Sequence, residues 1–452
     1  MKGARQEHKV KDFGQEQIRK LMDEAPELRR ELRRNQYLDR SELQQLQDAA
    51  FVKMVRHAYV NVPFYRKKYD EAGVDIESIR GASDAFRLPI LEKEDLIEAF
   101  PHRSIADGYS LDDLTTAVTG GSSGTTVRVA YSDETMRKRV MTAYRIYDMM
   151  MGGYHSHHVQ TYVYTGKYPL EGLLDGSFPL VHIWTLDPVE DARRKLLDSK
   201  PHMLTLYPSR LEDIRRGLTP QDVAELRENL VVINVKSEMS TQAQRDAWAE
   251  FFGVPVLDEY GSEEMAGTVA AQCPDKGYHI WEDIAVVEVV DEAGQPLPDG
   301  ETGELVATCL YNWAMPMIRY RQGDIAALHP ADHSCSCGRT LRQLKSFEGR
   351  RNSSFTLPSG RFLSSGYLLD VGYTRLMAYA DALDSWSLVQ REPDLVVFEC
   401  IPGPAMNEAV REAIQREVSE LLFHETKVQV EFVDALRTTN RGKRNQIISL
   451  VP

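Results

Sequence analysis

The chain has 452 residues, of which 42% are hydrophobic and 27% charged, so we expect a globular protein of at least two domains. Its net charge of −14 argues against nucleic acid or an anionic membrane as a partner, because both require a basic surface. The sequence contains neither an apolar run of about 18 residues nor an N-terminal signal peptide. We therefore expect a cytoplasmic protein with five reduced cysteines, among which any cluster indicates metal rather than a disulfide.

The first part of the chain is predicted to be helical, and the middle part to alternate between strands and helices. Residues 15–60 are predicted to be helical, with Leu43, Met54 and Ala58 on the core face and a capping box at Ser41 and Gln44. In the middle of the chain, strand-like and helix-like segments alternate, which favours parallel strands with helical crossovers; the clearest of these segments are 230–235, 241–252 and 254–261. From residue 284, strand runs broken by glycine and proline turns indicate an antiparallel or barrel-like segment.

The last hundred residues are predicted to form a separate unit. A strand over 394–401, a helix over 405–422 and a second strand over 427–433 make a β-α-β lobe, and a polar loop follows it. We therefore expect an α/β protein with a large N-terminal α/β domain, residues 1–349, which contains the barrel-like segment. A small, mobile α+β lid, residues 350–452, completes it.

The stretch TGGSSGTT, residues 119–126, combines three glycines with five hydroxyl side chains. Glycines let several backbone N–H groups converge and hydroxyls add donors, so the stretch is suited to phosphate oxygens. It lacks the lysine of a P-loop, and by itself a stretch of this composition is more often a flexible turn.

Other motifs separate these two readings. They are DEYGSEE (258–264), TGELV (302–306), YRQGD (320–324), GRRN (349–352) and RGKRN (441–445). In this combination and order the chain resembles the phenylacetate–CoA ligase family of the adenylate-forming acyl-CoA synthetases. The resemblance implies that ATP activates a carboxylic acid as an acyl-adenylate, with release of pyrophosphate, and that the acyl group then passes to a thiol.

The resemblance also implies roles for residues of this chain. Glu264 matches a Mg²⁺-associated glutamate, and Asp324 an acceptor of hydrogen bonds from the ribose hydroxyls. Lys443 matches the catalytic lysine, which would bridge the attacking carboxylate and the α-phosphate. The implied nucleotide-binding residues are Thr119, Gly120, Gly121, Ser122, Ser123, Gly124, Thr125, Thr126, Ser237, Glu238, Asp258, Glu259, Tyr260, Gly261, Asp324 and Arg350.

The positive charge missing from the glycine-rich stretch would thus arrive on the lid, with Lys443. In the resembled family the lid rotates after adenylation and withdraws its lysine. Arg350 and Asn352 lie at the expected hinge, but the family carries aspartate where this chain has Asn352 and Ser353, which weakens the assignment. Residues of the thiol step are therefore not carried over.

Four metal-ligand side chains fall in two groups, Cys273 with His279 and Cys335 with Cys337. Three thiolates and one imidazole complete a tetrahedral structural zinc site, although the spacing alone also fits unpaired thiols. The resemblance favours zinc. The histidines in GGYHSHH (152–158) lack a carboxylate or cysteine at helpful spacing, and we expect them to be exposed or substrate-facing.

Tyr162 and Tyr164 lie on one face of a predicted strand and, with Lys236, are candidates for the acid pocket; the tyrosines fit ordinary core positions equally well. The resemblance suggests an aryl or arylacetic acid, and coenzyme A as acceptor. A carrier-protein thiol or an amine stays open as acceptor, and so does a nucleotide-binding relative without ligase chemistry. The oligomeric state, including a homodimer, is not readable from the sequence.

Overall fold

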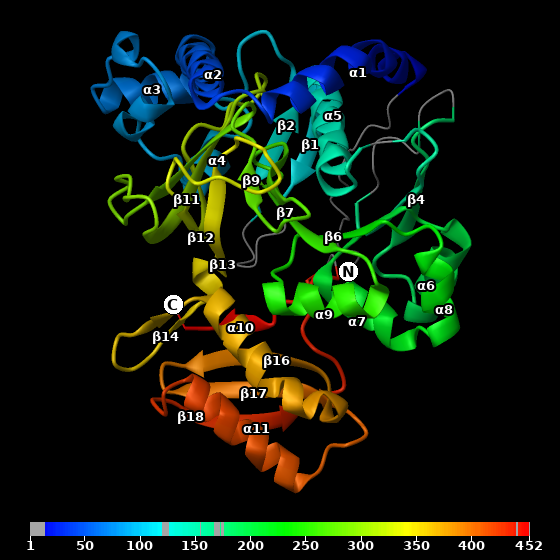
Figure 1. Cartoon of the computed structure of the whole chain (residues 1–452). Coiled ribbons are helices and arrows are strands. Elements are labelled where there is room, and N and C mark those ends of the chain that lie inside the picture. The colour runs from blue at the N-terminus through cyan, green and yellow to red at the C-terminus, as the bar shows by residue number, and fades with distance from the viewer. Residues whose placement is uncertain are drawn as a thin grey trace, which may run out of the picture.

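The chain folds into a large lobe and a small lobe (Figure 1). A cavity is lined by residues of both lobes. The computed structural model describes residues 14–119, 126–153, 155–166, 172, 176–439 and 442–451. Within these ranges, no helix is both long and apolar enough to span a membrane.

The large lobe begins with helices that pack beside the end of its sheet (Figure 1). These are α1 (Gln15–Asn35), α2 (Arg40–Asn61), α3 (Pro63–Glu71), η1 (Ile76–Ser78), η2 (Ala82–Arg87), α4 (Lys93–Ala99) and η3 (Leu111–Asp113). The predicted helical region is thus two helices, and Leu43, Met54 and Ala58 are buried as expected. The predicted cap is wrong: the Asp39 side chain caps α2 by accepting from the Glu42 N–H, and Ser41 lies inside the helix.

A hairpin and one large sheet follow. The hairpin pairs β1 (Thr115–Val118) with β2 (Arg128–Tyr131). In spatial order the sheet strands are β10 (Ala285–Val290), β11 (Thr302–Cys309), β12 (Tyr320–Leu328), β13 (Gln343–Arg350), β9 (Tyr278–Ile280), β8 (Gly267–Gln272), β7 (Val256–Ser262), β6 (Val232–Lys236), β5 (Met203–Leu206), β3 (Gln160–Tyr164) and β4 (Leu180–Trp184). Strands β4, β3, β5, β6 and β7 are parallel, and every pairing from β7 to β10 is antiparallel.

Alternating side chains of the parallel strands feed two cores. In β6, Val232 belongs to the core shared with the N-terminal helices, whereas Ile233 and Val235 belong to the core on the other face. The helices of this region are α5 (Asp133–Met150), α6 (Val189–Ser199), α7 (Pro208–Gly217), α8 (Pro220–Arg227) and α9 (Gln242–Phe252). The expected parallel strands with helical crossovers are therefore confirmed, and so is the antiparallel segment after residue 284.

The small lobe has its own core (Figure 1, bottom). Its elements are η4 (Arg351–Ser353), β14 (Phe355–Thr356), β15 (Phe362–Leu363), α10 (Ser365–Leu376), η5 (Met377–Ala382), β16 (Leu383–Glu392), β17 (Leu395–Pro402), α11 (Glu408–Leu421), β18 (Lys427–Phe432) and β19 (Ile447–Ser449). The predicted strand–helix–strand order is confirmed as β17, α11 and β18. The sequence reading missed α10 and β16.

Candidate active site

The candidate site lies where the parallel strands of the large lobe end. Tyr164 closes β3, Tyr207 follows β5, Ser237 follows β6, and Glu259 stands in β7. In open α/β sheets ligands bind at the carboxyl ends of the strands. A cavity of about 920 Å³ opens at this edge, and residues of both lobes line it, including Ser237, Tyr260 and, from the small lobe, Lys443.

The predicted ribose-binding group is in place at the cavity. The Tyr260 hydroxyl donates to Asp324 Oδ2 at 2.7 Å, and Arg350 Nε lies 3.4 Å from Asp324 Oδ1. Burial raises the pKa of Asp324, an effect that the Arg350 guanidinium opposes. All three residues line the cavity.

Asp258 lines the same cavity. Tyr278 donates to its Oδ2 at 3.3 Å, and Arg245 Nη1 lies 3.8 Å away. Burial raises the pKa of this carboxyl to about 7, and Arg245 only partly offsets the effect. The carboxylate of the neighbouring Glu259 is engaged in contacts within the protein, because it accepts hydrogen bonds from Asn234, Lys236 and Thr268.

Glu264 is partly buried beside Tyr320, whose hydroxyl lies 3.3 Å from Glu264 Oε1. Burial raises its pKa, with Arg350 acting in the opposite direction. The preceding Glu263 fixes this turn, because Arg139 of α5 holds its carboxylate at 2.8 and 3.2 Å and the Tyr131 hydroxyl donates to its carbonyl oxygen at 2.5 Å.

The glycine-rich stretch leaves the end of β1. Thr119 closes the hairpin: its N–H donates to the Val127 carbonyl at 2.9 Å, and its Oγ1 accepts from the Val127 N–H at 3.1 Å. Thr126 is exposed. Gly120, Gly121, Ser122, Ser123, Gly124 and Thr125, which we predicted to bind phosphates, lie outside the described residues.

The three acid-pocket candidates lie together. The Tyr162 and Tyr164 rings are 5.0 Å apart, and Lys236 Nζ lies 5.7 Å from the centre of the Tyr162 ring. Glu259 raises the pKa of Lys236 well above its usual range despite the opposing effect of burial. Burial would raise the pKa of Tyr164, but Lys443 and Lys236 outweigh it, so this pKa is lowered.

Lys443 reaches this group from the small lobe, with its Nζ 5.4 Å from the centre of the Tyr207 ring. The loop that carries it closes on itself: the Lys443 N–H donates to Thr439 Oγ1 at 3.2 Å, and the Thr439 N–H donates to the Lys443 carbonyl at 2.9 Å. Gly442 has φ +71°, and a Cβ there would lie 2.9 Å from Leu186 Cδ2. The left-handed backbone therefore favours glycine at this position, where the loop passes close to the Leu186 side chain of the large lobe.

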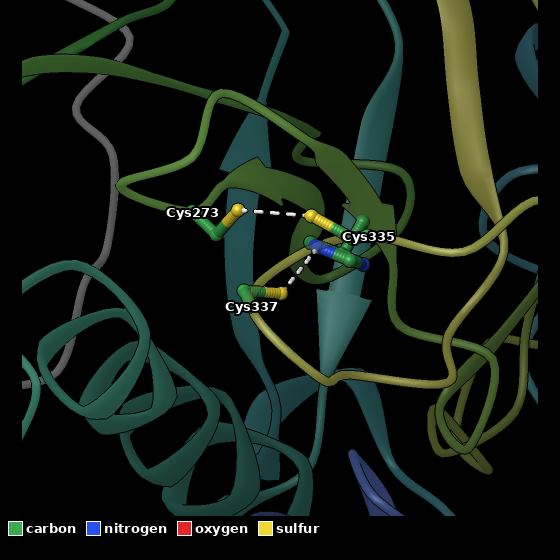
Figure 2. A group of neighbouring side chains, drawn as sticks. Cys273, Cys335 and Cys337 are labelled. Carbon is green, nitrogen blue, oxygen red and sulfur yellow. Dashed lines mark hydrogen bonds between the residues drawn. The ribbon is translucent and has the colours of Figure 1, made fainter.

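The four predicted zinc ligands come together. Their ligand atoms, from Cys273, His279, Cys335 and Cys337, all lie within 4.8 Å of one another. Cys273 Sγ is 3.7 Å from Cys335 Sγ, and Cys337 Sγ is 3.2 Å from His279 Nε2 (Figure 2). Pairing of β9 with β13, with His279 opposite Gln343, brings the distant segments together. Three thiols and one imidazole at these separations fit a tetrahedral zinc ion.

The other histidine group lies away from the cavity. His157 and His158 precede β3 and His202 precedes β5, so they stand at the amino ends of strands whose carboxyl ends form the site. They are therefore not substrate-facing. The Val159 N–H donates to His202 Nδ1 at 3.1 Å, which leaves the neutral ring's hydrogen on Nε2, the atom a metal would need. We assign no metal there.

Comparison with known proteins identifies the family. The sequence is 31% identical over 333 residues to the phenylacetate-coenzyme A ligase of Thermus thermophilus, a match that covers 69% of this chain and 71% of that protein. The chain belongs to the phenylacetate–CoA ligase family. The phenylacetate-coenzyme A ligase of Aromatoleum evansii is 26% identical over 462 residues, which cover 91% of this chain and 95% of that ligase. No family model matches the chain.

Comparison with solved structures shows that this chain has the fold of the adenylate-forming ligases. 2-Hydroxyisobutyryl-CoA ligase in its postadenylation state superposes with a TM-score of 0.74 at 20% identity, over 92% of this chain and 91% of that one. The same ligase in its thioesterification state gives 0.62. The two lobes of the present chain are thus arranged more as in the first of these two structures.

Sequence reasoning missed several residues around Lys443. Tyr207 and Ser209 directly follow the strand-like run MLTL. Because ligands bind at the carboxyl ends of parallel strands, this position could have indicated that both residues lie near the site. Arg444 stands directly after Lys443 in RGKRN. Asp213, its partner, carries no signal, because 231 residues separate the two.

Proposed function

We propose that this chain is an ATP- and Mg²⁺-dependent, AMP-forming ligase. It activates an aryl or arylacetic acid as the acyl-adenylate and passes the acyl group to coenzyme A. Membership of the phenylacetate–CoA ligase family supports both steps.

One observation carries the proposal: Lys443 of the small lobe, Asp324 and Tyr260 of the large lobe, and Arg350 at the junction between the lobes line one cavity. A volume of about 920 Å³ lies within the range of nucleotide-sized pockets, roughly 300–1,000 Å³. An ammonium aimed into a partly dry site stabilises charge that develops on an α-phosphate more than it would in water.

For each candidate nucleotide-binding residue we propose the role that the family resemblance implies. Asp324 accepts from the ribose hydroxyls, and Ser237, Glu238 and the segment Asp258–Gly261 border the adenine. Glu264 holds Mg²⁺, a hard cation that prefers carboxylate oxygens and phosphates. The glycine-rich stretch 119–126 holds the outer phosphates.

Tyr162 and Tyr164 contact the ring of the acid, with Lys236 at its side. The two rings lie 5.0 Å apart, with Tyr162 buried and Tyr164 partly buried, and aromatic side chains of this kind stack on the ring of an aryl acid. We place the domain boundary at 349/350, so that residues 350–452 rotate between the two half-reactions and withdraw Lys443 before the thiol attacks.

We further propose one structural zinc ion per chain, bound by Cys273, His279, Cys335 and Cys337. All four positions are protein ligands, so no position is open to water or substrate. Zinc analysis of the purified protein tests this, with Cys335→Ser expected to lose the ion. The expected cytoplasmic location remains a prediction of the sequence.

Pyrophosphate release tests the adenylation step. Aryl, arylacetic and aliphatic acids would be compared with and without coenzyme A, for the wild type, Lys443→Ala and Lys427→Ala, the last being an exposed lid lysine outside the cavity lining. We expect acid-dependent release to fall at least about 100-fold in Lys443→Ala and to stay unchanged in Lys427→Ala.

Analysis of the products tests the acceptor. AMP and an acyl-CoA should accumulate when coenzyme A is present. Adenylation without acyl-CoA would point instead to a carrier-protein thiol or an amine. ATP binding without release for any acid would contradict the ligase proposal and leave a nucleotide-binding protein.

A further inference from the structure

The loop that carries Lys443 is held against the large lobe by contacts of Lys443 and of the residue that follows it. Arg444, the next residue, forms a two-pronged ion pair with Asp213 of α7, with Nη1–Oδ1 and Nη2–Oδ2 both at 2.8 Å. Its side chain is 26% exposed and that of Asp213 is 21% exposed, so solvent screens the pair only in part.

A second carboxylate holds the backbone of the same residue. The Arg444 N–H donates to Glu238 Oε1 at 2.7 Å. Glu238 is itself fixed by the start of α7, because the Ser209 N–H and Oγ donate to its two oxygens at 2.9 and 3.0 Å. Burial raises the pKa of this carboxyl, and its hydrogen bonds with Ser209 and the Arg444 N–H act in the opposite direction.

The remaining contact is with Lys443 itself. Tyr207 stands at the N-cap position of α7, and its ring faces the Lys443 ammonium. Ser209 and Asp213 are four residues apart, so they lie on one face of the helix. The segment Tyr207–Asp213, which begins α7, thus presents an aromatic ring and an aspartate to one short loop, together with the Glu238 carboxylate that Ser209 fixes.

We propose that the segment Tyr207–Asp213 is the receptor for the lysine loop and that Asp213 is a positioning residue for adenylation. This inference rests on the proposed function. Asp213 does not line the cavity and acts through Arg444, whose guanidinium it holds so that the neighbouring ammonium points at the site. Because the loop must leave before the thiol can attack, the receptor acts in the first half-reaction alone.

The test separates the two half-reactions. Adenylation is followed by acid-dependent exchange of pyrophosphate into ATP, and thioester formation by adding preformed acyl-adenylate and coenzyme A. We expect Asp213→Asn and Arg444→Gln each to slow adenylation about tenfold and to leave thioester formation within about twofold of wild type. The double variant should be no slower than either single variant, because the residues act as one pair.

Two further variants show whether the effect belongs to the lysine loop. Asp213→Glu keeps the charge and should restore most of the exchange rate. Glu292→Gln removes one partner of a different ion pair between the lobes, Arg351 Nη2–Glu292 Oε1 at 2.8 Å, whose residues lie outside the cavity lining. It should leave the ratio of the two rates unchanged.

Hydrogen exchange gives a readout besides activity. Amides of residues 442–447 should exchange faster in Asp213→Asn than in wild type or Glu292→Gln. Equal losses in both half-reactions, or no loss in either, would overturn the inference. Failure of the wild type to exchange pyrophosphate would instead count against the proposed function.

Discussion

The carboxyl group of Asp258 makes the stability of this protein depend on pH. Its pKa is about 7 in the fold and near 3.8 in the unfolded chain, because burial disfavours the charge. Between these values the native state binds a proton that the unfolded state has released, so stability falls as pH rises. Asp258→Asn should therefore gain about 2 kcal/mol over wild type between pH 5 and pH 8, measured by urea unfolding.

Glu212 is a control, because its pKa is shifted in the opposite direction from that of Asp258. Burial alone would raise its pKa, but hydrogen bonds from Arg215 and Trp248 and the charge of Arg216 lower it to about 2. Its charged form thus stabilises the fold above its unfolded pKa, and that contribution is lost as the pH falls. Glu212→Gln should cost more stability at pH 7 than at pH 3. The same pH dependence in both variants would contradict an origin in these two carboxyls.

The residue scale is also where sequence reading succeeds and fails most visibly. The motifs DEYGSEE, YRQGD and RGKRN indicated Tyr260, Asp324 and Lys443, which line one cavity. Nothing in those motifs indicates Asp213, because its role arises from a contact with Arg444 across the interface between the lobes. Such a contact depends on how the lobes dock, which no local pattern encodes.

At the next scale, the junction of β13 and α10 sets how the lid is joined. Gly349 has φ +78°, and a Cβ there would overlap Ser365 Oγ of α10 and Met239 Sδ. Gly349→Ala should cost about 1 kcal/mol from the backbone and also displace α10. We expect acid-dependent pyrophosphate exchange to fall about tenfold.

Substitution of Gly360 is a control that separates the backbone strain at Gly349 from the contact of its Cβ with α10. It has φ +85°, but a Cβ there would meet nothing within 4 Å. Gly360→Ala should therefore lower the melting temperature by the backbone cost alone and keep the exchange rate within about twofold of wild type. If the two variants slow exchange equally, the position of α10 is not what governs adenylation.

Elements with a clear period were predictable. Ile414, Val418 and Leu421 face the lid core at helical spacing in α11, and β6 is a run of β-branched residues. Helix α10 was missed because its start at Ser364 lies in a serine- and glycine-rich segment that reads as a loop. The cap of α2 was misplaced because Asp39 and Ser41 both precede the apolar stripe and both have side chains that suit an N-cap. Only the backbone conformation, which is extended at Asp39 and helical from Arg40, decides between them.

At the scale of the whole molecule, the family resemblance, together with the ligand chemistry of zinc, predicted a long-range contact that periodicity could not. Cys273 and Cys335 are 62 residues apart in sequence, yet the need of zinc for four ligands paired the segments before any strand register was known. The register itself, with His279 opposite Gln343, then places Cys335 and Cys337 on a loop beside the N-terminal helices.

That loop ties the N-terminal helices to the sheet. The Thr340 N–H donates to the Gln36 carbonyl at 3.0 Å, its Oγ1 donates to the Leu38 carbonyl at 2.5 Å, and Arg339 Nε donates to Gln36 Oε1 at 2.8 Å. All three contacts lie at the junction of α1 and α2. The proposed zinc ion would hold this loop two to five residues away from them.

Removal of zinc should therefore loosen one end of the molecule and spare the other. With a chelator, or in Cys335→Ser, we expect faster hydrogen exchange over residues 36–61 and unchanged exchange over 383–400, together with a lower melting temperature. Cys400→Ser, in the lid core, should do the reverse. Equal changes in both lobes would mean that the cluster stabilises the chain as a whole, and no change would mean that the hydrogen bonds of Thr340 and Arg339 hold the junction without metal.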